Sequence, residues 1–176
     1  MTAIQSYTID AGIKEDELPD WLGRAAKKFG VFEDGRVNYT SADTAPIILC
    51  VVACGEEFLL LKRGYGLADA EGYWSVITGF IDEVKSVSEQ VSQELQEETG
   101  VAIEKSLITV GESYTLTNPQ EKRRYIIFPC LARLDEKPKI VLNHEHAEYR
   151  WITKRQLKDF HILDDLPYAI DAAFAA

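Results

Sequence analysis

The chain has 176 residues, and its 19 Lys and Arg residues against 29 Asp and Glu residues give a formal net charge of −10. A chain of this length is about the size of one domain and buries enough surface to fold without disulfides. The acidic balance opposes a broad electrostatic footprint for nucleic acid, so no nucleic-acid partner is expected. It also repels a small phosphorylated substrate, unless a bound cation inverts the local field.

The first residues, Met1 to Tyr7, contain no basic segment followed by an apolar run. No stretch of the chain approaches the roughly eighteen apolar residues that span a bilayer. The three cysteines are an odd number, which fits reduced thiols rather than a disulfide framework. These features predict a cytoplasmic protein without a membrane partner.

The first predicted element is a helix in an N-terminal extension. Apolar residues recur at helical spacing between Glu15 and Gly30, and the glycine is expected to end the helix. We assign the helix to an extension over residues 1–45, which is part of the same domain as residues 46–176.

A hairpin of buried strands is predicted next. Two continuous apolar runs, Ile47–Ala53 and Phe58–Leu61, are separated by a turn at Gly55. A further short strand, Tyr73–Ile77, is expected to lead into the loop at Gly79.

Two strands are predicted in the second half of the chain, at Leu107–Leu116 and Arg124–Leu134, separated by the turn signal Asn118-Pro119. Pro129 lacks an amide hydrogen, which predicts that the second of these strands is an edge strand or is bulged.

Further strands are predicted at Lys139–Leu142 and Tyr149–Ile152. The tail from Thr153 predicts one or two helices, and Pro167 is expected to open the last one. Together with the helix described next, this order predicts one mixed α/β domain.

The most strongly specified element is a helix over Val87–Thr99. Ser86 and Glu89 match a capping box at its start. Gly100 can adopt the left-handed conformation that closes a helix. At about 100° per residue, three apolar side chains define the direction of the core: Val87, Val91 and Leu95.

Three acidic residues on this helix are candidate metal ligands: Glu94, Glu97 and Glu98. A solvated acidic face is the ordinary interpretation, but Glu94 and Glu98 point close to the core direction. Two glutamates four residues apart repel each other, and an apolar layer adds a desolvation penalty. No Lys or Arg occurs from residue 86 through residue 104. A hard cation, Mg²⁺ or Mn²⁺, is therefore predicted between them.

At these residues the chain resembles the Nudix family. The Nudix box reads Gly, five residues, Glu, seven residues, then Arg-Glu-aliphatic-any-Glu-Glu-any-Gly-aliphatic. In this chain it begins at Gly79 and ends with Glu94 to Val101, with the spacing intact. Lys85 stands where the family has Glu, and Gln93 stands where it has Arg. The resemblance extends over about residues 46 to 152.

The resemblance implies a single-domain, Nudix-type α/β/α sandwich with a mixed β-sheet. It also implies that the backbone carbonyl of Thr78 and the carboxylates of Glu94, Glu97 and Glu98 hold the metal. Glu94 is the first candidate for the general base that activates water, and Glu98 is the second.

The two departures from the box change its scaffold together. In the family the replaced Glu and Arg are generally described as an ion pair that braces the loop against the helix. We expect either a hydrogen bond between Lys85 and Gln93 or an ion pair between Lys85 and Glu89 to brace it here. Reduced or unusual activity stays open.

Further candidate site residues lie outside the box. The ordinary interpretation of His144-Glu145-His146 is a polar loop, but the resemblance implies that Glu145 is an additional metal ligand or base. Four basic residues are candidate phosphate contacts: Lys62, Arg63, Arg123 and Arg124. Arg63 and Arg124 are preferred, and surface charge is the ordinary alternative for each of the four.

The resemblance implies a metal-dependent hydrolase that cleaves the diphosphate bond of a nucleoside diphosphate derivative. A nucleotide sugar, a dinucleotide or a nucleoside triphosphate would each fit, and the sequence does not choose among them. The main alternative is a non-catalytic nucleotide-binding or sensor module. An isomerase of the same fold would need an active-site cysteine, and none lies in a comparable setting. The N-terminal extension could pack against a second subunit to form a homodimer.

Overall fold

A mixed sheet of nine strands forms the centre of the computed structural model, which describes residues 7–66, 70–118 and 122–176. In chain order the strands are β1 (Thr8–Ala11), β2 (Thr44–Cys54), β3 (Glu57–Arg63), β4 (Trp74–Ser75), β5 (Ile77–Phe80), β6 (Ile108–Val110), β7 (Tyr114–Asn118), β8 (Arg123–Leu134) and β9 (His146–Thr153). The helices are α1 (Leu18–Phe29), α2 (Val87–Thr99) and α3 (Leu166–Phe174). Short 3-10 helices lie at Glu15–Glu17, Lys105–Leu107 and Lys154–Asp159.

β2 and β8 are the parallel centre of the sheet and pair along their whole length, from Thr44 opposite Arg124 to Cys54 opposite Leu134. On its other edge, β2 pairs first with β5 and then with β3, both antiparallel. The other edge of β8 is shared in the same way by β7 and β6. Each central strand therefore has two successive neighbours on one side.

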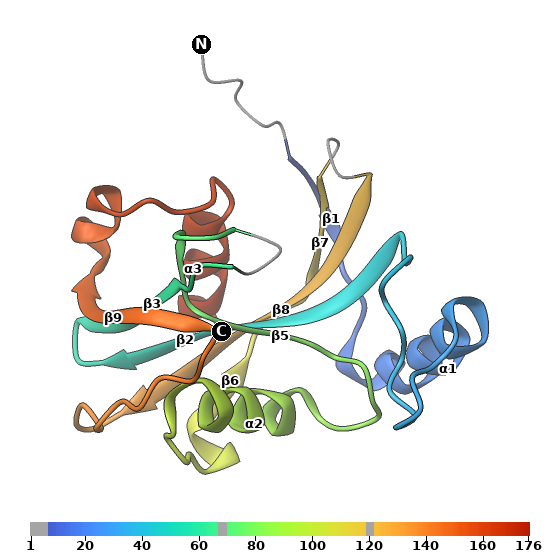
Figure 1. Cartoon of the computed structure of the whole chain (residues 1–176), viewed down its shortest axis with the longest axis horizontal. Coiled ribbons are helices and arrows are strands. Elements are labelled where there is room, and N and C mark those ends of the chain that lie inside the picture. Colours follow the sequence, from blue (N-terminus) through green and yellow to red (C-terminus); the bar gives the residue numbers. More distant parts are fainter. Residues whose placement is uncertain (1–6, 67–69, 119–121) are drawn as a thin grey trace.

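Helices cover both faces of this sheet (Figure 1). Alternate side chains of β2 point into two separate cores because successive residues of a strand face opposite sides. Ile48 and Cys50 pack with residues of α1 and α2. Leu49 and Val51 pack with residues of α3. Burial on both faces explains the continuous apolar run, and the predicted α/β/α sandwich is confirmed.

Several predicted elements are confirmed, with ends that shift by up to three residues. α1 ends where Gly30 follows it, β2 and β3 form the predicted hairpin, and α2 spans the predicted range. α3 has Pro167 in its first turn. The N-terminal residues join the fold directly, since β1 pairs with β7. Within the described residues, no helix is long and apolar enough to cross a membrane.

Of the two alternatives predicted for Pro129, an edge strand or a bulged strand, the edge strand is wrong, because β8 lies in the middle of the sheet. The segment predicted as one strand, Leu107–Leu116, is two strands, β6 and β7, and they separate near Gly111. The Gly111 amide donates to the Pro129 carbonyl at 2.8 Å. Pro129, which has no amide hydrogen, therefore lies opposite the break between β6 and β7. Part of the predicted turn before β8, at Pro119, lies outside the described residues.

The predicted strand Lys139–Leu142 is also wrong, because this extended segment crosses the end of α2 instead of joining the sheet. The Val141 amide donates to the Thr99 carbonyl at 2.8 Å, and the Asn143 amide donates to the Glu98 carbonyl at 3.2 Å. The last carbonyls of a helix have no partner inside the helix, and this segment satisfies two of them. The predicted strand Tyr73–Ile77 is likewise divided between β4 and β5.

Candidate active site

The ends of α2 fix which of its side chains face the sheet. At the start, the Ser86 Oγ accepts from the Glu89 amide at 3.2 Å, and the Ser86 amide donates to the Glu89 carboxylate at 2.9 Å. At the end, Gly100 has a φ of 71°, in the left-handed region. Between these caps, Val91 and Leu95 are fully buried against the sheet.

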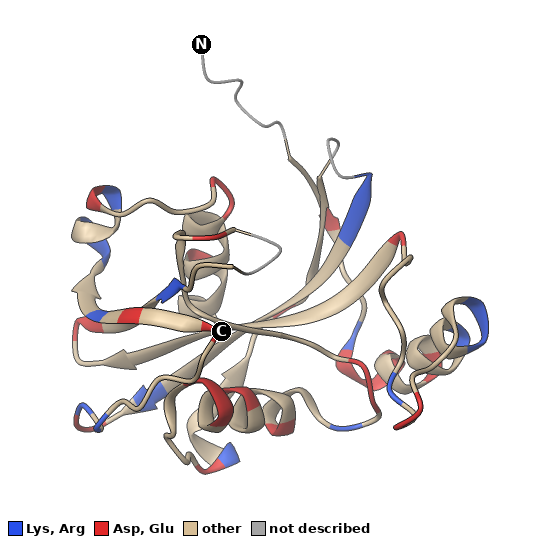
Figure 2. Ribbon diagram, in the orientation of Figure 1, with Lys and Arg blue, Asp and Glu red and all other residues tan. Residues whose placement is uncertain are grey.

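Two acidic side chains are carried inward with these apolar residues. Glu98 is only 4% exposed, and its Oε2 has no hydrogen-bond partner among the described residues. Glu94 is half-buried, and its Oε1 accepts from the side-chain amide of Gln90 at 2.7 Å. Glu97 is exposed on the flank of the helix. The acidic residues of α2 thus form a band along it (Figure 2).

Burial makes the two inward carboxyls difficult to ionise. Burial, the largest cause, and the charges of Glu97, Glu145 and Asp82 together raise the pKa of Glu94 to about 7, against the lowering effect of the Gln90 hydrogen bond. Burial and the charges of Glu94 and Glu145 together raise the pKa of Glu98 to about 9, against the lowering effect of Arg63. Each carboxylate would be stabilised by a cation placed between them.

A hydrogen-bonded chain braces the loop before α2. The Lys85 Nζ donates to the Gln93 Oε1 at 2.5 Å, and the Gln93 Nε2 donates to the Glu97 Oε1 at 2.8 Å. Lys85 also pairs with Glu83 at 2.5 Å. Of the two braces expected from the sequence, the Lys85–Gln93 bond is therefore the one formed. The Lys85–Glu89 pair does not form, because Glu89 pairs with Lys105 instead.

These carboxylates line a cleft of about 450 Å³, together with side chains from other elements. Thr78 and Gly79 of β5 form one wall, and Arg63 at the end of β3 lines the cleft as well. A Cβ atom on Gly79 would overlap the Glu94 carboxylate, so only glycine leaves space for that side chain.

The loop before β9 brings Glu145 to the same cleft. The Glu145 carbonyl accepts from the Gly64 amide at 2.8 Å, which ties this loop to the end of β3. The adjacent His146 ring is buried, with its Nε2 3.7 Å from the Glu98 Oε2. Burial lowers the pKa of His146, which favours the neutral ring beside Glu98.

Sequence reasoning missed several residues of this cleft. Arg36 and Asp82 lie 3.5 Å apart and line it, as do the aromatic rings of Phe80 and Tyr125. The Arg123 guanidinium lies over both rings, at 5.6 and 5.3 Å from their centroids. The residues come from separate strands and loops, and no local spacing in the sequence connects them.

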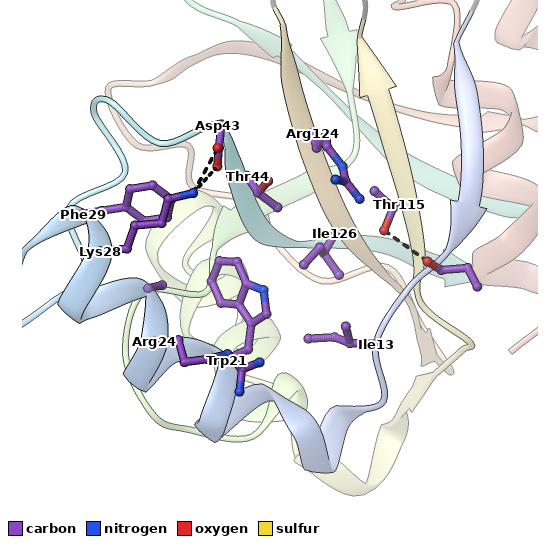
Figure 3. Close-up of a pocket in the computed structure, with 12 residues that line it drawn as sticks. Ile13, Trp21, Arg24, Lys28, Phe29, Asp43, Thr44, Thr115, Arg124 and Ile126 are labelled. Atoms are coloured by element: carbon purple, nitrogen blue, oxygen red, sulfur yellow. Dashed lines mark hydrogen bonds and ion pairs between the residues drawn. The ribbon is translucent and has the colours of Figure 1, made fainter.

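Arg124 is not brought to the carboxylates, although the sequence analysis preferred it as a phosphate contact. It lines a separate hollow of about 460 Å³ between α1 and the strands, where Trp21, Arg24 and Ile126 also lie (Figure 3). The other two basic candidates have local roles. Lys62 pairs with Glu148 at 2.9 Å, and Arg123 donates to the Tyr39 carbonyl at 3.1 Å. Of the four candidates, Arg63 is therefore the one that lines the carboxylate cleft.

The residues of the cleft fit a divalent ion chemically. In the described part of the chain, no three Asp, Glu, His or Cys side chains are drawn together at ion-binding distances. Glu98 nevertheless has a buried oxygen without a partner, and Gly79 leaves the space that Glu94 fills. Carboxylate oxygens are the ligands that Mg²⁺ and Mn²⁺ prefer.

A mixed sheet between helices, with a capped helix that turns carboxylates into a cleft beside arginines, defines a class of protein that acts on phosphorylated small molecules. The NUDIX domain family matches the chain over residues 43–170. The chain belongs to this family and is a Nudix pyrophosphohydrolase. Nudix hydrolases generally need divalent metal ions.

Solved structures share the fold at low sequence identity. The MutT protein from Methanosarcina mazei Go1 has a TM-score of 0.59 and 19% identity, over 75% of this chain and 94% of that chain. The NUDIX domain of Shewanella oneidensis NrtR, complexed with ADP ribose, has a TM-score of 0.63 and 17% identity, over 75% and 87%. A bifunctional NMN adenylyltransferase/ADP ribose pyrophosphatase from Francisella tularensis, complexed with AMP and a manganese ion, has a TM-score of 0.60 and 17% identity, over 89% and 45%. No curated protein sequence matches the chain.

Proposed function

We propose that this pyrophosphohydrolase cleaves the diphosphate bond of a nucleoside diphosphate derivative by attack of water at phosphorus, with Mg²⁺ or Mn²⁺ as cofactor. The proposed ligands are the carbonyl oxygen of Thr78 and the carboxylates of Glu94, Glu97, Glu98 and Glu145. The observation that carries the proposal is the buried Glu98 carboxyl, whose Oε2 has no hydrogen-bond partner in the described chain. Burial of an acceptor without a partner is unfavourable, and a cation removes that penalty.

The side chains of the cleft divide the work of the reaction. When bound, a divalent ion supplies charge neutralisation for the diphosphate and lowers the pKa of water. Glu94 is the first candidate to accept the proton from the attacking water, and Glu98 is the second. Arg63, which lines the same cleft, binds a phosphate oxygen. The Lys85–Gln93 hydrogen bond keeps the loop against α2 while this happens.

The aromatic residues of the cleft suit a nucleoside. Phe80 and Tyr125 offer aromatic faces for a base, and Arg36 adds a second cation for phosphate or ribose oxygens. Two structural neighbours hold ADP ribose and AMP with manganese, which supports a nucleotide derivative as the substrate. Arg124 receives no phosphate contact in this proposal, because it lines the other hollow. A cytoplasmic location and a homodimer remain predictions.

Hydrolysis of a substrate panel tests the proposal. Purified protein is incubated with Mg²⁺ or Mn²⁺ and with nucleotide sugars, dinucleotides and nucleoside triphosphates, and the products are separated by chromatography. Glu97→Gln and Glu98→Gln are each expected to lower kcat/KM by at least about 100-fold, as expected for loss of a metal ligand or a base. Glu56→Gln, an exposed change in the turn between β2 and β3, is the matched control and should keep full activity.

Each result of this assay has a clear consequence. Ion-dependent turnover that the two helix variants lose supports the hydrolase. Ion-dependent nucleotide binding without turnover, measured by calorimetry, would instead favour the sensor module. Turnover that persists in Glu97→Gln and Glu98→Gln would show that the catalytic centre lies elsewhere.

A further inference from the structure

Gln90 is a buried amide at the candidate active site. It lies one helical turn before Glu94 on α2, lines the carboxylate cleft and is only 3% exposed. Its Nε2 donates to the Glu94 Oε1 at 2.7 Å. Its Oε1 is buried and has no hydrogen-bond partner among the described residues. Half of the amide is therefore satisfied, and the other half is not.

Two of the three buried side-chain atoms that lack a partner in the described chain are oxygens of residues at this cleft. Of the buried side-chain atoms in the described chain, Gln90 Oε1, Glu98 Oε2 and Arg123 Nε lack a partner. Gln90 and Glu98 both line the cleft, and their unpaired oxygens are acceptors. Buried polar groups are normally paired, so an acceptor left without a partner at this cleft indicates a positively charged or donating group beside it.

The hydrogen bond to Glu94 sets the orientation of the Gln90 amide. The Nε2 faces the Glu94 Oε1, to which it donates. The Oε1 is the other polar atom of the same amide and has no partner among the described residues. An amide oxygen is a hard ligand like a carboxylate oxygen, but it carries no charge. It can therefore add a ligand without increasing the repulsion among the surrounding acidic side chains.

We propose that Gln90 is an additional ligand of the divalent ion, which it binds through its Oε1 while its Nε2 holds Glu94 in place. The inference rests on the proposed function, since it requires the ion that Glu94 and Glu98 hold. It adds a neutral oxygen to the carboxylate set and makes the affinity for the ion depend on a residue outside the Nudix box glutamates.

Binding of Mn²⁺, measured by titration calorimetry and by the electron paramagnetic resonance signal of the free ion, tests the proposal without turnover. Gln90→Met keeps the side-chain volume and removes the oxygen, and is expected to weaken Mn²⁺ binding by about tenfold. Gln90→Glu keeps an oxygen in that position but loses the donor to Glu94, and is expected to bind Mn²⁺ at least as tightly as the unchanged chain. Gln96→Met, an exposed change on the same helix, is the matched control and should not alter binding.

The two Gln90 variants separate a ligand from a residue that only positions Glu94. A purely positioning role predicts weaker binding in both, because each loses the Nε2 donor. The proposal is overturned if Gln90→Glu binds more weakly, or if Gln90→Met binds like the unchanged chain. If Gln90→Met does not fold, Gln90→Glu still decides. Absence of Mn²⁺ binding by the unchanged chain would instead refute the proposed function itself, and the inference with it.

Discussion

Replacing Glu98 by Gln should stabilise the protein in EDTA, and the gain should grow as the pH rises. Burial, together with the neighbouring Glu94 and Glu145, raises the pKa of Glu98 from its ordinary 4.5 to about 9. The folded state therefore keeps a proton on this carboxyl that the unfolded chain releases. Stability from this group is fully present below the unfolded pKa and is lost as the pH rises through the folded pKa.

The size of the effect follows from the difference between the ordinary pKa of Glu98, 4.5, and its folded-state pKa of about 9. Each pH unit between these two values lowers the free energy of unfolding by up to about 1.4 kcal/mol. Between about pH 5 and pH 7, Glu98 therefore removes up to about 3 kcal/mol from the stability of the unchanged chain. Glutamine has the same shape but does not titrate, so the stability of Glu98→Gln does not fall with pH through this group.

Urea unfolding in EDTA at about pH 5, 6, 7 and 8 measures the prediction. The difference in unfolding free energy between Glu98→Gln and the unchanged chain should increase with pH. Glu97→Gln, on the exposed flank of α2, should show no such increase. With saturating Mg²⁺ the order should reverse, because the unchanged chain gains binding energy that the variant lacks. Parallel pH profiles for the unchanged chain and Glu98→Gln would refute the assignment of Glu98 as a buried, unpaired carboxyl.

Three further predictions concern Gly79, Ser86 and Lys85. Gly79→Ala should lower kcat/KM at least about tenfold with little change in Tm, because its Cβ displaces a flexible carboxylate from the cleft. The control Gly23→Ala, which meets nothing within 4 Å in α1, should raise stability by up to about 1 kcal/mol. Ser86→Ala should destabilise the fold by about 1 kcal/mol in thermal unfolding, through loss of the helix cap. Lys85→Glu alone should lower activity by repulsion from nearby acids, and Gln93→Arg added to it should restore most of that loss in a double-mutant cycle.

The elements that could be predicted from the sequence are those with a local code. α2 carries both of its caps and its apolar stripe within a few residues, so its bounds and its inward acids followed from spacing alone. The strand predicted at Lys139–Leu142 is wrong because the backbone of this segment hydrogen-bonds to the end of α2, about 40 residues earlier in the chain. No local feature of the sequence indicates that contact. The edge-strand prediction for β8 failed because Pro129 lies opposite the break between β6 and β7, near Gly111, where the sheet needs no amide hydrogen from it.

The arginines show why the site itself was only partly predictable. Arg63 and Arg124 are equally basic in the sequence, and each lies at an end of a strand: Arg63 is the last residue of β3, and Arg124 is the second residue of β8. Whether a strand residue faces the cleft depends on the register of the whole sheet. Tyr125 lines the carboxylate cleft, whereas its neighbour Arg124 lines the other hollow. A shift of one position therefore separates a cleft residue from a residue in a different pocket, and no local motif records it.

The two departures from the Nudix box replace the family's ion pair by hydrogen bonds through Gln93. In the family pattern a Glu and an Arg contribute no net charge, whereas Lys85 and Gln93 contribute one positive charge to a cleft rich in acids. The Gln93 amide has both an acceptor and a donor, so it can take a hydrogen bond from Lys85 and give one to Glu97. An arginine at that position could only donate. Because these hydrogen bonds end on Glu97, they hold the loop against α2 and also fix a proposed metal ligand. The Lys85 ammonium and the Glu97 carboxylate both have a partner.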